Sequence, residues 1–200
     1  MAALMLKVPD ETARVLGEIP VPGKAEDNGS FHVTVMYLGK DLPIERIGEM
    51  LPVIYEVTSK TQPFSVTTSH VTNFPGGDDG VPVIAQIDSP ALHRFRDKLT
   101  QAFEAADIHY DNKFPEFTPH TTLSYDPDPD TEVDFEIPKV TWGVAALTLW
   151  GADRGTGRLL VQFPLSLSQG KVAGSGFRRE ALYRAEVRLS LWGQRNRVVG

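Results

Sequence analysis

The residues best suited to chemistry in this sequence lie in two short, similar segments, each with a histidine followed two places later by a threonine. The segments read His32-Val33-Thr34-Val35-Met36-Tyr37 and His120-Thr121-Thr122-Leu123-Ser124-Tyr125, and both fit the pattern His-x-Thr-aliphatic-x-Tyr. One such segment is unremarkable, because a lone histidine on a strand is usually a structural residue held by hydrogen bonds. The repetition of the whole pattern favours a functional role for both segments.

Two imidazoles and two hydroxyls are suited to phosphoryl transfer. A neutral imidazole can accept the proton of an attacking oxygen, while a protonated imidazole gives a proton to the leaving oxygen. The threonine hydroxyls can donate hydrogen bonds to the non-bridging phosphate oxygens and so stabilise charge as it develops. This chemistry requires no metal and no other cofactor.

The spacing within each segment has a chemical consequence if both segments are strands. Residues 31–38 are rich in β-branched and aromatic types and stop at Gly39, which predicts a strand with both faces covered. Residues 119–125 are predicted as a second strand. Side chains two positions apart on a strand share a face, so each histidine lies beside its threonine. A duplicated unit folded about a pseudo-twofold axis would bring both pairs to one cleft.

The rest of the sequence alternates helices with strands, which predicts an α+β domain. A helix is expected after Asp10, which we predict as its cap, and another from Pro43, with Pro52 expected to kink or split it. Ser89 and Pro90 are predicted as the cap and first turn of a third helix. Its buried stripe is predicted to hold Leu92, Phe95, Leu99 and Phe103.

Further strands are expected at 4–8, 64–71, 81–87, 132–137, 144–150 and 159–163. The glycine-rich loop at 76–80 lacks the lysine of a phosphate-binding loop, so it is interpreted as a hairpin connection.

The last thirty residues differ from the rest in charge. Residues 171–200 carry seven basic and two acidic side chains, a balance of +5, which leaves −11 on residues 1–170 because the formal net charge is −6. We predict a domain over 1–165, a linker over 166–176 and a basic appendage over 177–200, with an amphipathic helix at 177–192. Such a helix is suited to an acidic partner, to nucleic acid or to the chain's own acidic domain, and the alternative is a solvated extension with no role.

Composition excludes several classes of protein. Hydrophobic residues make up 41% and charged residues 23%, which excludes global disorder, and the absence of cysteine excludes disulfides and thiolate chemistry. No apolar run is as long as a membrane span and no signal-peptide pattern opens the chain, so we predict a cytoplasmic protein that binds no membrane. The acidic domain argues against a long duplex, and the expected partner is a nucleotide or short oligonucleotide.

The other histidines fit no motif. His70, His93 and His109 are predicted to be structural or exposed, and His109 with Asp111 supplies too few ligands for a metal site. The large aromatic residues are expected in the core rather than as platforms for bases; these are Phe31, Phe114, Phe117, Trp142 and Trp150.

At its two His-x-Thr segments, with Leu38-Gly39 after the first and Phe117-Thr118-Pro119 before the second, the sequence resembles the two-histidine (2H) phosphoesterases. These include bacterial 2′-5′ RNA ligases and RNA 2′,3′-cyclic phosphodiesterases, and the resemblance covers about residues 1–165. It implies a bilobal α+β fold, with two pseudo-symmetric antiparallel sheets around a central cleft and helices outside. It also implies metal-independent hydrolysis of a nucleotide 2′,3′-cyclic or 2′-5′ phosphodiester. His32 and His120 would then be the acid and base, and Thr34 and Thr122 the phosphate clamps.

Tyr125 departs from many RNA-processing members, which carry an arginine three residues after the second threonine. The loss of that cation argues against a polyanionic RNA end, and Tyr125 is a candidate substrate-binding residue that could stack on a base, although strict alternation turns it away from the cleft. The motif pair with tyrosine also resembles phosphoesterases of bacteriophages, some of which hydrolyse nucleotide second messengers of host immunity. A cyclic oligonucleotide is therefore an alternative substrate. A non-catalytic module that binds a nucleotide or RNA end is another alternative, but the intact histidines and threonines favour an enzyme.

Overall fold

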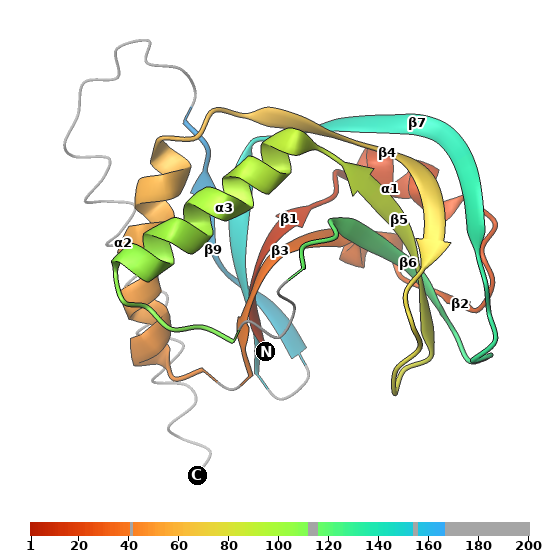
Figure 1. Ribbon diagram of the computed structural model, residues 1–200, viewed down its shortest axis with the longest axis horizontal. Coiled ribbons are helices and arrows are strands. Elements are labelled where there is room, and N and C mark those ends of the chain that lie inside the picture. The colour runs from red at the N-terminus through yellow and green to blue at the C-terminus, as the bar shows by residue number, and fades with distance from the viewer. Residues whose placement is uncertain (41, 112–115, 154–155, 167–200) are drawn as a thin grey trace.

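The computed structural model describes residues 1–40, 42–111, 116–153 and 156–166. Their strands form two antiparallel sheets, and the larger sheet curls strongly (Figure 1). The elements are β1 (Ala2–Lys7), α1 (Asp10–Gly17), β2 (Lys24–Ala25), a 3₁₀ turn η1 (Asn28–Ser30), β3 (His32–Gly39), α2 (Ile44–Ser59), β4 (Phe64–Asn73), β5 (Val81–Asp88), α3 (Pro90–Ala105), β6 (His120–Asp126), β7 (Asp134–Val144), β8 (Ala146–Asp153) and β9 (Thr156–Pro164).

The chain is built from a duplicated unit. The strand orders are β3-β1-β8-β9 in one sheet and β2-β6-β5-β4-β7 in the other. In the first unit β1 leads through α1 to β3, which pairs antiparallel with β1; in the second, β5 leads through α3 to β6, which pairs antiparallel with β5. The two His-x-Thr segments therefore occupy equivalent strands. The predicted two-lobed α+β fold of antiparallel sheets is confirmed.

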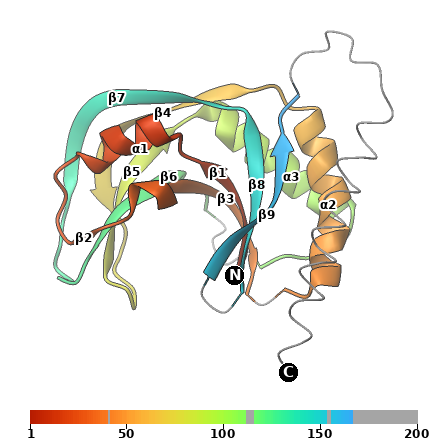
Figure 2. The same ribbon diagram turned by 180° about the vertical axis from the view of Figure 1, so that it is seen from behind.

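One hydrophobic cluster joins both sheets and the helices. The predicted stripe of α3 is confirmed, since Leu92, Phe95, Leu99 and Phe103 are all buried, and full burial of each such side chain contributes about 1.5–3 kcal/mol. Helices α2 and α3 pack against each other, and α1 contacts β7 (Figures 1 and 2). Among the described residues, none of the helices combines the length and apolar character that crossing a membrane requires.

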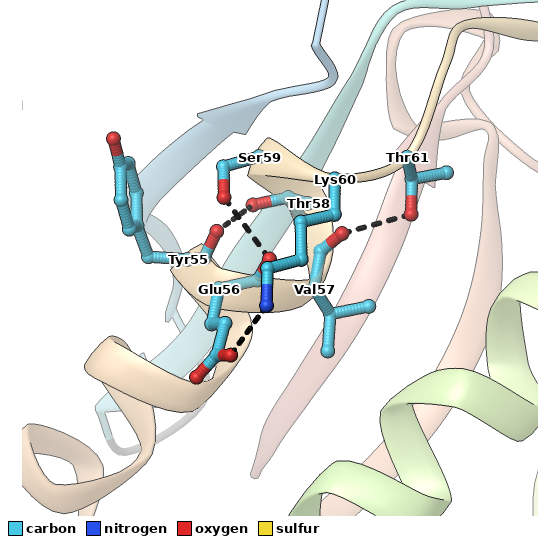
Figure 3. A network of polar contacts seen from close by, with 7 residues as sticks. All are labelled: Tyr55, Glu56, Val57, Thr58, Ser59, Lys60 and Thr61. Carbon is cyan, nitrogen blue, oxygen red and sulfur yellow. Dashed lines mark hydrogen bonds and ion pairs between the residues drawn. The ribbon is translucent and has the colours of Figure 1, made fainter.

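Polar contacts close the C-terminal end of α2 (Figure 3). The Thr58 hydroxyl donates to the Ile54 carbonyl at 2.9 Å, and the Thr61 hydroxyl donates to the Val57 carbonyl at 2.8 Å. The carbonyls of Thr58 and Thr61 accept the backbone N–H of Ser166 at 3.3 and 2.8 Å. Because the last carbonyls of a helix lack partners within it, the segment after β9 completes this helix end.

Three local expectations need correction. Asp10 is the first residue of α1 rather than its cap, which is Pro9 without a side-chain hydrogen bond, because the Asp10 carboxylate pairs with Lys7 at 2.8 Å. The helix α2 runs through Pro52, so the expected split is absent, and a kink there stays a prediction. Strand β3 is not covered on both faces, since His32 is exposed and two further side chains are half-buried.

Two further predictions are confirmed. Ser89 caps α3 as predicted, accepting the Leu92 N–H at 3.2 Å, and residues 76–80 connect the antiparallel pair β4 and β5. The predicted helix at 177–192 and most of the predicted linker, from 167 onward, lie outside the described residues.

Candidate active site

The structure brings the two predicted histidines together from different sheets. His32 is the first residue of β3 and His120 is the first residue of β6. Cα atoms of these two strands come within 8 Å of each other, although no ladder joins them. The charge of His32 also acts on the pKa of His120. The two imidazoles are therefore close enough for the charge of one to influence the other.

Both histidines make the same hydrogen bond to the backbone two residues earlier. His32 Nδ1 lies 2.8 Å from the Ser30 carbonyl oxygen, and His120 Nδ1 lies 2.7 Å from the Thr118 carbonyl oxygen. A carbonyl oxygen only accepts, so Nδ1 carries the proton in each ring. The neutral form of each imidazole then has its lone pair on Nε2, which is the atom able to exchange a proton with a substrate.

Local structure fixes both carbonyl groups. Ser30 ends the turn η1, in which the Asp27 carboxylate accepts the Gly29 N–H at 2.7 Å, and the Ser30 hydroxyl donates to Glu26 at 3.1 Å. Before the second histidine, the Pro119 carbonyl accepts the Ile87 N–H at 2.8 Å, which joins this segment to β5. The backbone therefore fixes the position of Nδ1 in both histidines.

The second histidine is the more enclosed of the two. Phe74, just after β4, lies edge-on to the His120 ring with centroids 4.7 Å apart and an interplanar angle of 90°. Burial lowers the pKa of His120, the hydrogen bond to Thr118 opposes this effect, and the charge of His32 lowers the pKa further. His120 is therefore held in its neutral form at a lower pH than an exposed histidine.

A β-bulge follows the threonine in each motif strand. In β3, Met5 pairs with Thr34 and Leu4 pairs with Met36, so Val35 is the extra residue. In β6, Ile84 pairs with Thr122 and Val83 pairs with Ser124, so Leu123 is the extra residue. An extra residue on one strand reverses the alternation of faces beyond it. The burial patterns agree: the histidine, threonine and tyrosine positions are the more exposed ones in both strands.

Tyr125 consequently lies on the same face as Thr122, which corrects the expectation from strict alternation. The Thr122 hydroxyl lies close enough to Tyr125 to act on the pKa of its phenol. Burial raises the pKa of the Tyr125 phenol, the Glu26 carboxylate raises it further, the Thr122 hydrogen bond lowers it, and Asp79 makes a smaller upward contribution.

Sequence reasoning missed several residues at this site. Phe74 lies in a loop with no periodicity, and Glu26 and Asp79 come from segments whose proximity to Tyr125 depends on strand pairing. Lys24 faces Tyr125 in the register of β2 with β6, which the sequence did not predict as a strand pair.

The remaining histidines stand apart from this pair. His70 Nε2 contacts Asp134 at 2.8 Å and its Nδ1 contacts Glu136 at 3.3 Å. His93 packs on Phe117, and exposed His109 approaches Asp107 rather than Asp111. Within the described ranges, no three histidine or acidic side chains are grouped so as to hold a metal ion.

The aromatic residues expected in the core divide into two groups. Phe31 and Trp142 are buried, whereas Phe117 and Trp150 are half-buried, and Phe114 lies outside the described residues. The half-buried Phe117 ring lies under the Arg96 guanidinium at 4.8 Å.

Comparisons with known proteins agree with this geometry. A family model described as the 2′-5′ RNA ligase superfamily matches residues 23–156. TT0787 of Thermus thermophilus superposes with a TM-score of 0.67 at 19% identity, over 82% of this chain and 97% of that one. E. coli LigT complexed with 3′-AMP gives 0.61 at 16% identity, over 82% and 97%. A structure described as a phosphoesterase gives 0.61 at 17% identity, over 82% and 98%. No curated protein sequence matches this chain.

Proposed function

The chain belongs to the 2′-5′ RNA ligase superfamily, and we propose that it is a metal-independent phosphodiesterase that hydrolyses a nucleotide 2′,3′-cyclic or 2′-5′ phosphodiester. The observation that carries this proposal is the duplicated hydrogen bond from Nδ1 to a backbone carbonyl, which prepares Nε2 of two neighbouring histidines for proton transfer. A module that only binds a ligand has no evident need for two such groups.

His120 acts as the general base in this mechanism. Its burial and the nearby charge of His32 lower its pKa, so its Nε2 is unprotonated at neutral pH and accepts the proton of an attacking water. The bond between Nδ1–H and Thr118 holds the ring in the tautomer that this step requires.

His32 acts as the general acid. As water attacks phosphorus and its proton passes to His120, the bond from phosphorus to one ribose oxygen breaks, and that oxygen takes a proton from Nε2 of protonated His32. The product is a nucleotide monoester, released together with the second nucleoside when the substrate is a 2′-5′ diester, and the two histidines then exchange protons with solvent. Thr34 and Thr122 donate to the non-bridging oxygens, where negative charge grows in the transition state.

The ligands of a structural neighbour support a phosphate-bearing substrate. LigT of E. coli has been crystallised with 3′-AMP, NADP⁺, ATP and phosphate. These molecules share phosphate groups, and all but phosphate also carry an adenine nucleotide. The fold therefore suits nucleotide phosphates.

The charges of this chain favour a small substrate over a long RNA. Tyr125 occupies the position where many RNA-processing relatives have an arginine, and Glu26 and Asp79 lie close enough to act on its pKa. Carboxylates near the phosphate site oppose additional phosphates of a polyanion.

A substrate screen tests this function. Purified protein is incubated with 2′,3′-cyclic mononucleotides, 2′-5′-linked dinucleotides and cyclic oligonucleotides, each with a chelator present, and products are separated by chromatography. We expect hydrolysis of at least one nucleotide diester that is lost in both His32→Ala and His120→Ala. Absence of turnover on all three classes by the folded wild-type protein would contradict the proposal.

A further inference from the structure

A row of side chains crosses the larger sheet, starting at His120. Gln86 of β5 lies directly opposite His120, His70 of β4 lies opposite Gln86, and Glu136 of β7 lies opposite His70. Residues directly opposite each other on neighbouring strands share one face of a sheet. The strands β6, β5, β4 and β7 follow one another in this sheet (Figure 1), so the four side chains form one line that leads away from the candidate active site.

This row lies on the open face of the sheet. The next row along the strands points to the opposite face and is fully buried; it consists of Val71, Ala85 and Thr121. Gln86, by contrast, is exposed, and His70 is half-buried. A ligand bound at His120 can therefore extend over this row without displacing the core.

Gln86 is the member of the row nearest the phosphate of the proposed function, which is held by His32 and His120. Because β5 is hydrogen-bonded to β6 at His120, β3 must bring His32 to His120 from another side. Gln86 is one strand spacing from His120, about 4.8 Å. A nucleoside that leaves the phosphate on the β5 side meets the Gln86 amide first, and that amide both donates and accepts hydrogen bonds.

Apolar side chains lie beside this row. Ile84, two positions before Gln86 on the same face of β5, is buried. Phe74 follows β4 and lies edge-on to the His120 ring with centroids 4.7 Å apart. Sites for small ligands combine an apolar surface with a few polar groups that fix orientation. Phe74 and Ile84 provide the first for a flat base, and Gln86 provides the second for its edge.

The far end of the row is acidic. His70 Nε2 lies 2.8 Å from an Asp134 oxygen, and His70 Nδ1 lies 3.3 Å from a Glu136 oxygen. Both ring nitrogens of His70 are thus engaged, while each carboxylate side chain is 80% exposed. An ionised carboxylate only accepts hydrogen bonds. This end therefore attracts N–H donors and opposes a second phosphate.

We propose that this row is a nucleobase site: Gln86 hydrogen-bonds the edge of the base, and the carboxylates of Asp134 and Glu136 accept an exocyclic amino group. The site then prefers adenine or cytosine nucleotides, which carry such a group, over uracil nucleotides, which have a carbonyl oxygen in its place. Gln86 is the specificity-determining residue nearest the reaction. The inference rests on the proposed function, because it starts from a phosphate held by His32 and His120.

Steady-state kinetics on 2′,3′-cyclic AMP and 2′,3′-cyclic UMP test the site. We expect the wild-type protein to favour the adenine substrate in kcat/KM by about 5-fold or more, the effect of a hydrogen bond to a charged group. Gln86→Met keeps the length of the side chain and removes its amide, and should raise KM for the adenine substrate about 10-fold. Glu136→Gln should reduce the preference for adenine.

Gln101→Met is the matched control. Gln101 is an exposed glutamine on α3, and its substitution should leave both KM values at those of the wild-type protein. An unchanged KM for the adenine substrate in Gln86→Met would overturn the base site, and so would equal use of both substrates by the wild-type protein.

Calorimetric binding of 3′-AMP, 3′-UMP and inorganic phosphate separates this inference from the proposed function. The base site predicts tighter binding of 3′-AMP than of 3′-UMP, and a loss in Gln86→Met that is larger for 3′-AMP than for inorganic phosphate. With this result, absent turnover of every diester would overturn the proposed function and support the base site. Equal binding of the two nucleotides, or an equal loss for 3′-AMP and inorganic phosphate in Gln86→Met, would overturn the base site, whatever the turnover.

Discussion

The Phe74 ring lies edge-on against the imidazole of His120, with centroids 4.7 Å apart. Phe74 thus contributes to the burial that lowers the pKa of His120. A general base with a lowered pKa stays neutral to a lower pH, and activity is lost only as the pH falls through that pKa. The acidic limb of the pH profile therefore reports on this contact.

We predict that Phe74→Ala moves the acidic limb of the kcat/KM profile to higher pH, because the more exposed imidazole loses part of the burial that lowers its pKa. Phe74→Leu, which keeps an apolar cover, should shift the limb less. The measurement is kcat/KM between about pH 4 and 9. A limb that stays in place or moves to lower pH in Phe74→Ala would show that burial by Phe74 does not set this pKa.

Thr34 is expected to act mainly in the transition state. Thr34→Val should lower kcat by about 10²-fold, as for the loss of one donor to developing negative charge, while KM changes little. Thr34→Ser retains the hydroxyl and should recover much of the rate. A pure increase in KM for Thr34→Val would mean that the hydroxyl serves only ground-state binding.

Removal of divalent ions should leave the activity unchanged. The proposed proton transfers use only imidazoles, and the charge is stabilised by hydroxyls, so dialysis against a chelator has no target at the site. Rates are compared before and after this treatment. Loss of activity that a divalent ion restores would contradict the mechanism.

The end of the folded domain can be located by truncation. A chain ending at Ser166 keeps buried Leu165 and the bonds of Ser166 to the end of α2, so we expect it to fold and retain kcat/KM on a small nucleotide. A chain ending at Phe163 loses both features and should be less stable by about 2 kcal/mol or more, as measured by thermal unfolding. If the chain that ends at Ser166 is folded but inactive, residues after 166 must contribute to the site.

The sequence predicts the fold and the two motif strands because their signals are local. The pattern of β-branched residues marks β3, Ser89 marks the start of α3, and the repetition of His-x-Thr marks the candidate site. The meeting of the strands was inferred from that repetition, and the approach of β3 to β6 agrees with it.

Other features depend on pairing between distant segments and have no local signal. The bulges at Val35 and Leu123 appear only in the register with β1 and β5, so strict alternation misplaces Tyr125. The approach of Phe74 to His120 depends on the β4–β5 connection. The exposed face of β3 was missed because residue types alone do not show which face of a strand is left open to solvent.

The central claim is that His32 and His120 form one acid–base pair, and single substitutions test it most directly. Turnover of the best diester from the substrate screen is measured for His32→Ala and His120→Ala, with circular dichroism and thermal unfolding as checks of the fold. The account predicts that each variant remains folded and loses activity by about 10²- to 10⁴-fold, and that the double variant loses little more than the more damaging single one. A folded variant of either histidine with turnover near the wild-type rate would contradict the paired mechanism.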